Sequence, residues 1–215
     1  ERLYTMTTRS PQPEDRSRRR VAKPVWREAG VYGVLVALYV LIAIIEPSFR
    51  GWPNFRNVLT QISMTAIVAV GMTFVILTAG IDLSVGSVAA LSACFPAVLM
   101  AYRGFGGPQG FVLTICIGAF LGLLNGLAIS VAGLPPFIAT LAMMVMARGL
   151  AFVVSGGGAI YNLPASYLWF GSGNVAENVP LIEKVPAMVA LMLLLYVLGH
   201  ILLQRTHLGR YVYSV

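Results

Sequence analysis

Gly80-Ile81-Asp82-Leu83-Ser84-Val85-Gly86 interrupts a long apolar region of the sequence. Neither the run before it, residues 58–79, nor the run after it, residues 87–102, contains a charged residue. A helix needs about 20 apolar residues to cross the hydrocarbon core of a membrane. Glycine often ends a helix, and Asp or Ser can accept hydrogen bonds from the free N–H groups at the start of the next one. The stretch therefore predicts a helix that breaks near residues 80–86.

The whole chain has the composition of a membrane protein. Of its 215 residues, 58% are hydrophobic and 11% are charged, and the mean hydropathy is +0.80. A soluble domain carries roughly 25% charged residues. Between Asn57 and Ala176 the only charged residues are Asp82, Arg103 and Arg148. This pattern excludes an ordinary globular domain and predicts several membrane crossings.

Six apolar segments reach or approach the length of a membrane span. They are residues 29–45, 58–79, 84–102, 111–131, 137–155 and 185–203. Only helices and closed barrels satisfy the backbone hydrogen bonds in lipid, and these segments lack the alternation of a barrel strand. The sequence therefore predicts an all-α fold, with a polytopic bundle of transmembrane helices over residues 29–203.

Basic residues predict the orientation of the chain in the membrane. Eight of the 15 Lys and Arg residues lie in residues 1–28, which we expect to form a basic cytoplasmic tail. Residues 156–184 then form an external loop, whereas the 80–86 break and residues 204–215 are cytoplasmic. Ten basic residues lie inside and four outside in this arrangement. The charge of the tail fits anionic lipid, so we expect the bilayer as its partner and no nucleic acid.

Asp82 is the only acid within residues 47–176. A carboxylate at membrane depth is costly and marks a functional site unless it lies at an interface. Two compatible interpretations stay open. In the first, Asp82 or Ser84 is a structural N-cap for the following helix. In the second, the break between Gly80 and Gly86 lines a translocation path, as irregular backbone at membrane depth usually does.

Glycines recur every four residues in the fourth predicted span, at Gly118, Gly122 and Gly126, and Asn125 lies beside them. Small residues let two membrane helices approach closely, and an amide side chain can form a hydrogen bond between them. We interpret this set as a helix-packing surface. Direct contact with a transported solute is the alternative.

A few polar residues within the spans are candidates for the lining of a pore. Gln61, Thr65 and Thr73 fall near one face of the second span, although such a face is also typical of a bundle interior. Thr140 and Arg148 lie in the fifth span. An arginine at that depth must reach the interface, pair with another group or face a polar cavity.

Several motifs of enzymes and ion-coupled transporters are missing from the sequence. It contains no P-loop, no His-Glu-x-x-His motif and no row of intramembrane acids for a proton relay. We therefore predict no catalytic residues, no metal site and no cofactor in this chain. The pattern favours a protein that lets a solute through, with energy supplied by another subunit.

Three blocks of the sequence resemble one family. The first covers residues 69–87 and contains the Gly80-to-Gly86 stretch. The second runs from Gly122-Leu123-Leu124-Asn125-Gly126 through Pro135-Pro136-Phe137-Ile138-Ala139-Thr140-Leu141 to Arg148-Gly149-Leu150-Ala151. The third is Arg205-Thr206-His207-Leu208-Gly209-Arg210-Tyr211-Val212-Tyr213. From about Val58 onward, the chain is thus similar to the permease subunits of ribose/xylose/galactose-type (simple sugar) ABC transporters.

This resemblance implies partners and a larger subunit. Family members have about ten helices and pair as homodimers, so this chain is expected to represent the amino-terminal part of such a subunit. Two cytoplasmic ATPase subunits bind ATP and Mg, and a periplasmic sugar-binding protein delivers the solute to the inner membrane. Residues 204–215 would begin the cytoplasmic coupling region, with Arg205, Gly209, Arg210 and Tyr211 on the ATPase side.

The resemblance implies import of a monosaccharide or similar small polyol by alternating access. A neutral polyol needs hydroxyl, amide and backbone groups and no fixed countercharge, which fits a chain with few intramembrane charges. Three alternatives remain: a secondary transporter or facilitator of a small neutral solute, a permease for branched-chain amino acids, and a membrane assembly protein that moves no solute.

Overall fold

A computed structural model describes residues 25–175 and 185–214. Most of the predicted tail, residues 1–28, and part of the predicted external loop therefore lie outside the described residues. The described residues form helices and turns without a β-strand, which confirms the predicted all-α fold. The chain divides into two compact units, residues 1–51 and residues 52–215.

The first unit contains helix α1 (Val25–Ile45) and the short 3₁₀ helix η2 (Pro47–Arg50). The rings of Tyr39 and Phe49 meet edge to face at 5.2 Å and join the two elements. Glu46 caps η2, because its Oε1 accepts hydrogen bonds from the Ser48 hydroxyl at 2.7 Å and the Ser48 N–H at 3.2 Å. These two bonds hold the pKa of the Glu46 carboxyl below its usual value.

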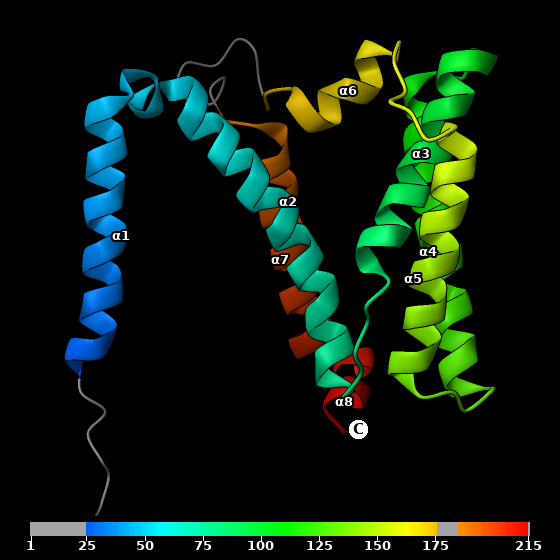
Figure 1. Cartoon of the computed structure of the whole chain (residues 1–215). Helices are drawn as coiled ribbons and strands as arrows, with labels where there is room; N and C mark the ends of the chain where they lie inside the picture. The colour runs from blue at the N-terminus through cyan, green and yellow to red at the C-terminus, as the bar shows by residue number, and fades with distance from the viewer. Residues whose placement is uncertain (1–24, 176–184, 215) are drawn as a thin grey trace, which may run out of the picture. The chain divides into compact units, whose positions relative to one another are not determined.

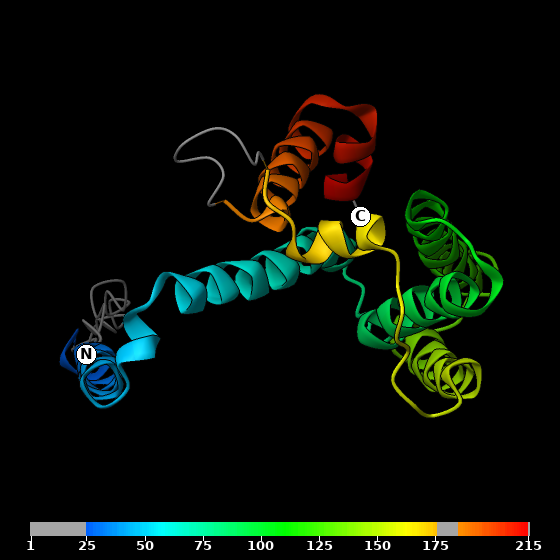
Figure 2. The same cartoon turned by 90° about the horizontal axis from the view of Figure 1, so that it is seen from above.

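The second unit contains two groups of packed helices. One group consists of α3 (Val85–Arg103), α4 (Gly107–Ser130) and α5 (Pro136–Ser155) (Figure 1). The other consists of α2 (Trp52–Leu77), α7 (Ala187–Arg205) and the short α8 (His207–Ser214). Helix α6 (Ala165–Ser172) contacts both α4 and α7, so it connects the groups (Figure 2).

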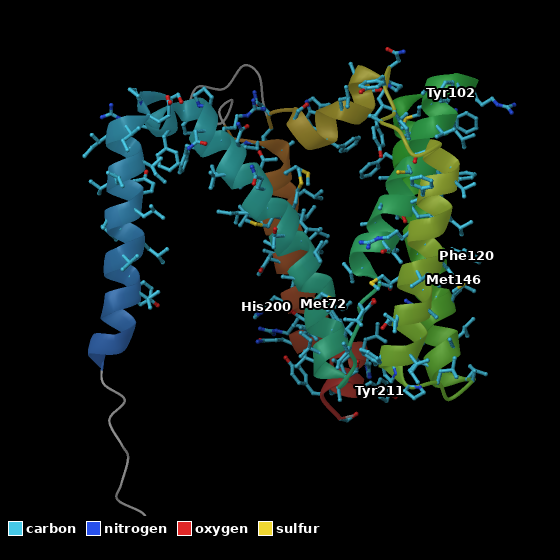
Figure 3. The ribbon with its side chains drawn as sticks, viewed as in Figure 1. Met72, Tyr102, Phe120, Met146, His200 and Tyr211 are labelled. Carbon is cyan, nitrogen blue, oxygen red and sulfur yellow. The ribbon has the colours of Figure 1, made fainter. Side chains whose placement is uncertain are left out.

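Five described helices are long and apolar enough to cross a membrane, namely α2, α3, α4, α5 and α7. The sequence predicted six spans. In α1, the apolar part Gly30–Ile45 is shorter than the about 20 residues that cross the hydrocarbon core, so the count of six is not supported by the described residues. Phe120 on α4 and Met146 on α5 are 58% and 55% exposed and point away from their helix group, as lipid-facing side chains do (Figure 3).

Helix α6 lies inside the stretch predicted as an external loop, residues 156–184. It follows Pro164, whose restricted backbone suits the start of a helix. The Phe170 ring stacks on Phe111 of α4 with ring centroids 4.1 Å apart. The Tyr167 hydroxyl lies 3.3 Å from the Thr114 hydroxyl, also on α4. Aromatic packing and this polar contact therefore hold α6 against α4.

The core of the second unit lies among α3, α4 and α5. Leu91, Leu121, Met143, Ala147 and Ala151 are buried there. Ser92 faces the same interface: it is 3% exposed, and a methyl group added at Gly118 of α4 would meet its hydroxyl at 3.4 Å. The Ser92 hydroxyl has no hydrogen-bond partner among the described residues.

We expect Ser92→Ala to stabilise the protein. The substitution removes a buried hydroxyl that makes no hydrogen bond, and leaving such a group unpaired costs about 1–3 kcal/mol. A gain of about 1 kcal/mol would raise Tm by roughly 2–4 °C, which thermal unfolding in detergent would measure. Ser63→Ala is the control, because the equally buried Ser63 hydroxyl donates to the Leu59 carbonyl at 2.7 Å. A higher Tm in both variants, or in neither, would contradict this account.

Candidate functional site

The break between α2 and α3 is the candidate functional site. Helix α2 ends at Leu77, and Ala79 adopts the left-handed conformation with φ 54°. The Gly80 N–H donates to the Val75 carbonyl at 2.9 Å, and the Ala79 N–H donates to the Ile76 carbonyl at 3.0 Å. This pair of bonds is a Schellman motif. The helix was predicted to end through Gly80, but Ala79 takes the left-handed position.

Gly80 contributes in a different way, through a close approach to α2. A methyl group at Gly80 would lie 3.1 Å from the Val75 carbonyl oxygen and 3.1 Å from the Val75 Cγ1. The backbone of the break therefore passes too close to the last turn of α2 for a side chain to fit without displacement.

Asp82 organises the start of α3. Its Oδ1 accepts a hydrogen bond from the Ser84 N–H at 2.7 Å and another from the Ser84 hydroxyl at 2.6 Å. Ser84 occupies the N-cap position of α3, but its own side chain makes no capping bond. The acid thus holds the residue that precedes the helix, and the serine hydroxyl is directed toward the acid. Gly86, in the first turn of α3, is exposed and has no atom near its missing side chain.

Two other helices form hydrogen bonds with the break. The Asn125 Nδ2 of α4 donates to the Ser84 hydroxyl oxygen at 2.9 Å, and both side chains are buried. The Thr140 hydroxyl of α5, which is 2% exposed, lies 3.2 Å from the Ile81 carbonyl and 2.8 Å from the Pro136 carbonyl. A chain of donors therefore runs from Asn125 through Ser84 to Asp82.

These bonds place the break inside the helix group. Asn125 lies five residues before the end of α4 at Ser130, and Thr140 lies four residues after the start of α5 at Pro136. At 1.5 Å per residue, the irregular backbone is held about 6–8 Å inside the ends of these helices. The sequence predicted that the break lies on the cytoplasmic side and left open that it lines a translocation path. In the structure the neighbouring helices extend beyond it.

The break presents several free hydrogen-bond acceptors. Within the described part of the chain, no hydrogen bond reaches the Gly80 or Asp82 carbonyl, and both hydrogen bonds to the Asp82 side chain use Oδ1, which leaves Oδ2 free. Such oxygens can accept bonds from the hydroxyl groups of a neutral solute. Among the described residues there is no group of three or more His, Cys, Asp and Glu side chains that could hold a metal ion.

The other predicted site residues do not converge on the break. Gln61, Thr65 and Thr73 are exposed on α2, and both threonine hydroxyls donate to carbonyls of their own helix. Arg148 is exposed on α5. The sequence assigned Asn125 to helix packing and Thr140 to the lining of a pore. The structure brings Asn125 to the Ser84 hydroxyl and Thr140 to the Ile81 carbonyl, and no spacing in the sequence indicated this.

The glycines of α4 differ from the predicted packing surface. Of the three predicted packing glycines, only Gly118 approaches another helix, at Ser92 of α3. A methyl group at Gly122 or Gly126 would meet no atom within 4 Å, so these two glycines contact no other helix of the described chain.

The predicted ATPase-side residues lie at the junction of α7 and α8. Arg205 ends α7, and Gly209 is buried where the first turn of α8 meets the Leu203 carbonyl. Arg210 contacts the His207 ring at 2.6 Å. Tyr211 is 69% exposed (Figure 3).

We expect Ser84 and Asn125 to be energetically coupled. Because Asn125 donates to the Ser84 hydroxyl in a buried position, the effects of Asn125→Ala and Ser84→Ala on the free energy of unfolding should not add. Contacting polar pairs show coupling of about 0.5–3 kcal/mol. Thermal or denaturant unfolding of both single variants and the double variant would measure this term. Additive effects would show that the hydrogen bond contributes nothing.

Comparison with known proteins supports one family. Residues 54–215 match the model of the family described as branched-chain amino acid transport system / permease component. The ribose import permease protein of Escherichia coli is 37% identical over 84% of this chain and 56% of its own length. The Bacillus subtilis ribose import permease protein is 37% identical over 89% of this chain and 58% of its own.

A third relative is named for a different sugar. The galactofuranose transporter permease protein of Escherichia coli is 35% identical over 74% of this chain and 44% of its own length. The chain thus spans about half the length of the curated relatives it matches. No solved structure matches it. The apolar helices and these similarities confirm the resemblance to sugar ABC permeases, and the chain is a multi-pass membrane protein that belongs to the family described as branched-chain amino acid transport system / permease component.

Proposed function

We propose that this chain forms part of the permease subunit of an ATP-binding-cassette importer in the bacterial inner membrane. Its substrate would be a monosaccharide or a similar small polyol. Similarity to ribose and galactofuranose permeases supports the substrate class. The observation that carries the proposal is the break at residues 80–84, where free backbone and carboxylate oxygens face no described partner.

The geometry of the break suits a neutral polyol. Its hydroxyl groups are hydrogen-bond donors, and the free oxygens of Gly80 and Asp82 are acceptors. A few weak hydrogen bonds allow a solute to enter and leave, whereas a tight site would slow its release. Asn125 and Thr140 would act as positioning residues, because Asn125 holds the Ser84 hydroxyl that donates to Asp82 and Thr140 holds the Ile81 carbonyl.

The partners follow from the proposed function. A second permease copy would complete the translocation path, two cytoplasmic ATPase subunits would bind ATP and Mg, and a periplasmic binding protein would deliver the sugar. The amino terminus and the α7–α8 junction would then be cytoplasmic. The bias of Lys and Arg toward residues 1–28 supports this orientation.

Uptake into proteoliposomes tests the proposal. The full-length permease would be reconstituted with its ATPase and binding protein, and uptake of labelled ribose would be measured with and without ATP. ATP-dependent uptake is the expected result. Uptake without ATP and the ATPase would indicate a facilitator instead.

A second candidate is a permease for branched-chain amino acids, which the description of the matching family favours. The same proteoliposomes would be supplied with labelled leucine and an amino-acid-binding protein. ATP-dependent leucine uptake without sugar uptake would replace the sugar proposal.

A further inference from the structure

Arg56 reaches from α2 to the carboxyl end of α6. Its Nη2 donates a hydrogen bond to the carbonyl of Ser172, the last residue of α6. Its Nε is buried and has no partner within the described part of the chain. A guanidinium carries five N–H donors in a planar fork that matches a phosphate group, so Arg56 has the capacity for a further acceptor.

An unpaired acceptor lies close by in the chain. The Asn174 Oδ1 is buried and receives no hydrogen bond from a described residue. Its backbone is fixed, because the flanking Gly173 carbonyl accepts from the Ala187 N–H at 2.9 Å and the Val175 N–H donates to the Val185 carbonyl at 3.1 Å. Arg56, which contacts Ser172, thus has an unpaired donor, and Asn174, two residues after Ser172, has an unpaired acceptor.

The same region contains an apolar cavity of about 270 Å³ between α4, α6 and α7. Its lining is hydrocarbon and aromatic, with Phe111, Phe170 and Val175 near the Ser172 end and Leu191 and Leu194 along α7. Phe170 and Val175 lie on either side of Ser172 in the sequence. Ser172, whose carbonyl Arg56 contacts, thus lies two residues after one lining residue and three before another.

Exposed aromatic side chains mark the depth of this region in the membrane. Trp52 and Phe55 in the first turn of α2 are 45% and 53% exposed, and Trp169 on α6 is 42% exposed. Trp residues concentrate where the hydrocarbon core meets the headgroups. Arg56, one residue after Phe55, therefore lies near the level of lipid phosphates.

We propose that Arg56 and this cavity bind one phospholipid. The guanidinium holds the phosphodiester, the Asn174 Oδ1 accepts from a hydroxyl or ammonium group of the headgroup, and one acyl chain occupies the cavity. Charge complementarity selects this occupant: a guanidinium with an unused donor matches a phosphate, and it contacts Ser172, which lies in sequence between two residues that line the apolar cavity.

Native mass spectrometry of the full-length permease tests the proposal. The protein would be released from nanodiscs that contain equal amounts of phosphatidylglycerol and phosphatidylcholine, and the retained lipid would be identified. Phosphatidylglycerol has a hydroxyl donor and phosphatidylcholine has none, so phosphatidylglycerol should be retained in preference. Arg56→Gln should lower its retention by about tenfold, as expected for the loss of a charge-assisted hydrogen bond.

Two further variants separate lipid binding from folding. Ala190→Phe fills the lined cavity and leaves Arg56 in place, and it should also release the lipid. Arg103→Gln removes an exposed arginine at the end of α3 and should leave retention unchanged. Equal retention by Arg56→Gln and the unchanged protein would overturn the proposal. So would equal retention of the two lipids, or a lower Tm of Arg56→Gln with lipid still bound, which would show that Arg56 only holds α6.

Discussion

Asp82→Ala should nearly abolish ATP-dependent uptake while folded permease is still made. The substitution removes the oxygen that accepts hydrogen bonds from both the N–H and the hydroxyl of Ser84. Hydrogen bonds to a charged group contribute about 1.5–3 kcal/mol each. Without these bonds, the observed conformation of the break should be about 3 kcal/mol less favourable. At 1.4 kcal/mol for each factor of ten, this corresponds to roughly a hundredfold decrease in uptake. Initial rates of sugar uptake in proteoliposomes would measure it.

Asp82→Asn is the matched control for this prediction. Asparagine keeps an oxygen in the Oδ1 position and can still accept both bonds from Ser84, so its uptake should lie closer to that of the unchanged protein. The amount of folded protein, measured by size-exclusion chromatography, should be similar in all three. If folded Asp82→Ala disappears in proportion to uptake, Asp82 is only a structural cap. If Asp82→Asn loses as much uptake as Asp82→Ala, the negative charge itself is required.

The sequence predicted the helical class and the break because both depend on local patterns. Apolar run length and the Gly-Ile-Asp-Leu-Ser-Val-Gly stretch carry that information within a few residues. The left-handed position of Ala79 was missed, because glycine is the usual residue there and propensity points to Gly80. Helix α6 was also missed. It has only eight residues, between glycines and prolines, and this is too short for a helical pattern of apolar residues to be recognised.

The meeting of Asn125 and Thr140 at the break could not be predicted from the sequence. It depends on which face of α4 and α5 turns toward α3, and apolar residues surround both helices, so the hydrophobic pattern does not define a face. Both residues belong to the second block of sequence that resembles the permease family, but that resemblance did not indicate that they meet at the break. Only the packed helices show that the 80–84 backbone, α4 and α5 form one hydrogen-bonded unit.

Gly107→Ala should detach α6 from α4 and lower the stability of the permease. A methyl group at Gly107 would lie 2.5 Å from the Tyr167 backbone nitrogen and 2.9 Å from the Ser166 carbonyl carbon. Backbone atoms cannot rotate away as a side chain can, so α6 must move. Overpacking of this kind costs about 1–3 kcal/mol, which corresponds to a decrease in Tm of roughly 3–10 °C. Thermal unfolding of the detergent-solubilised protein would measure it.

Gly71→Ala is the control, because Gly71 lies within α2 and a methyl group there meets no atom within 4 Å. Alanine favours a helix over glycine by up to about 1 kcal/mol, so this variant should be unchanged or slightly more stable. An unchanged Tm of Gly107→Ala would mean that α6 does not press on α4 at this position.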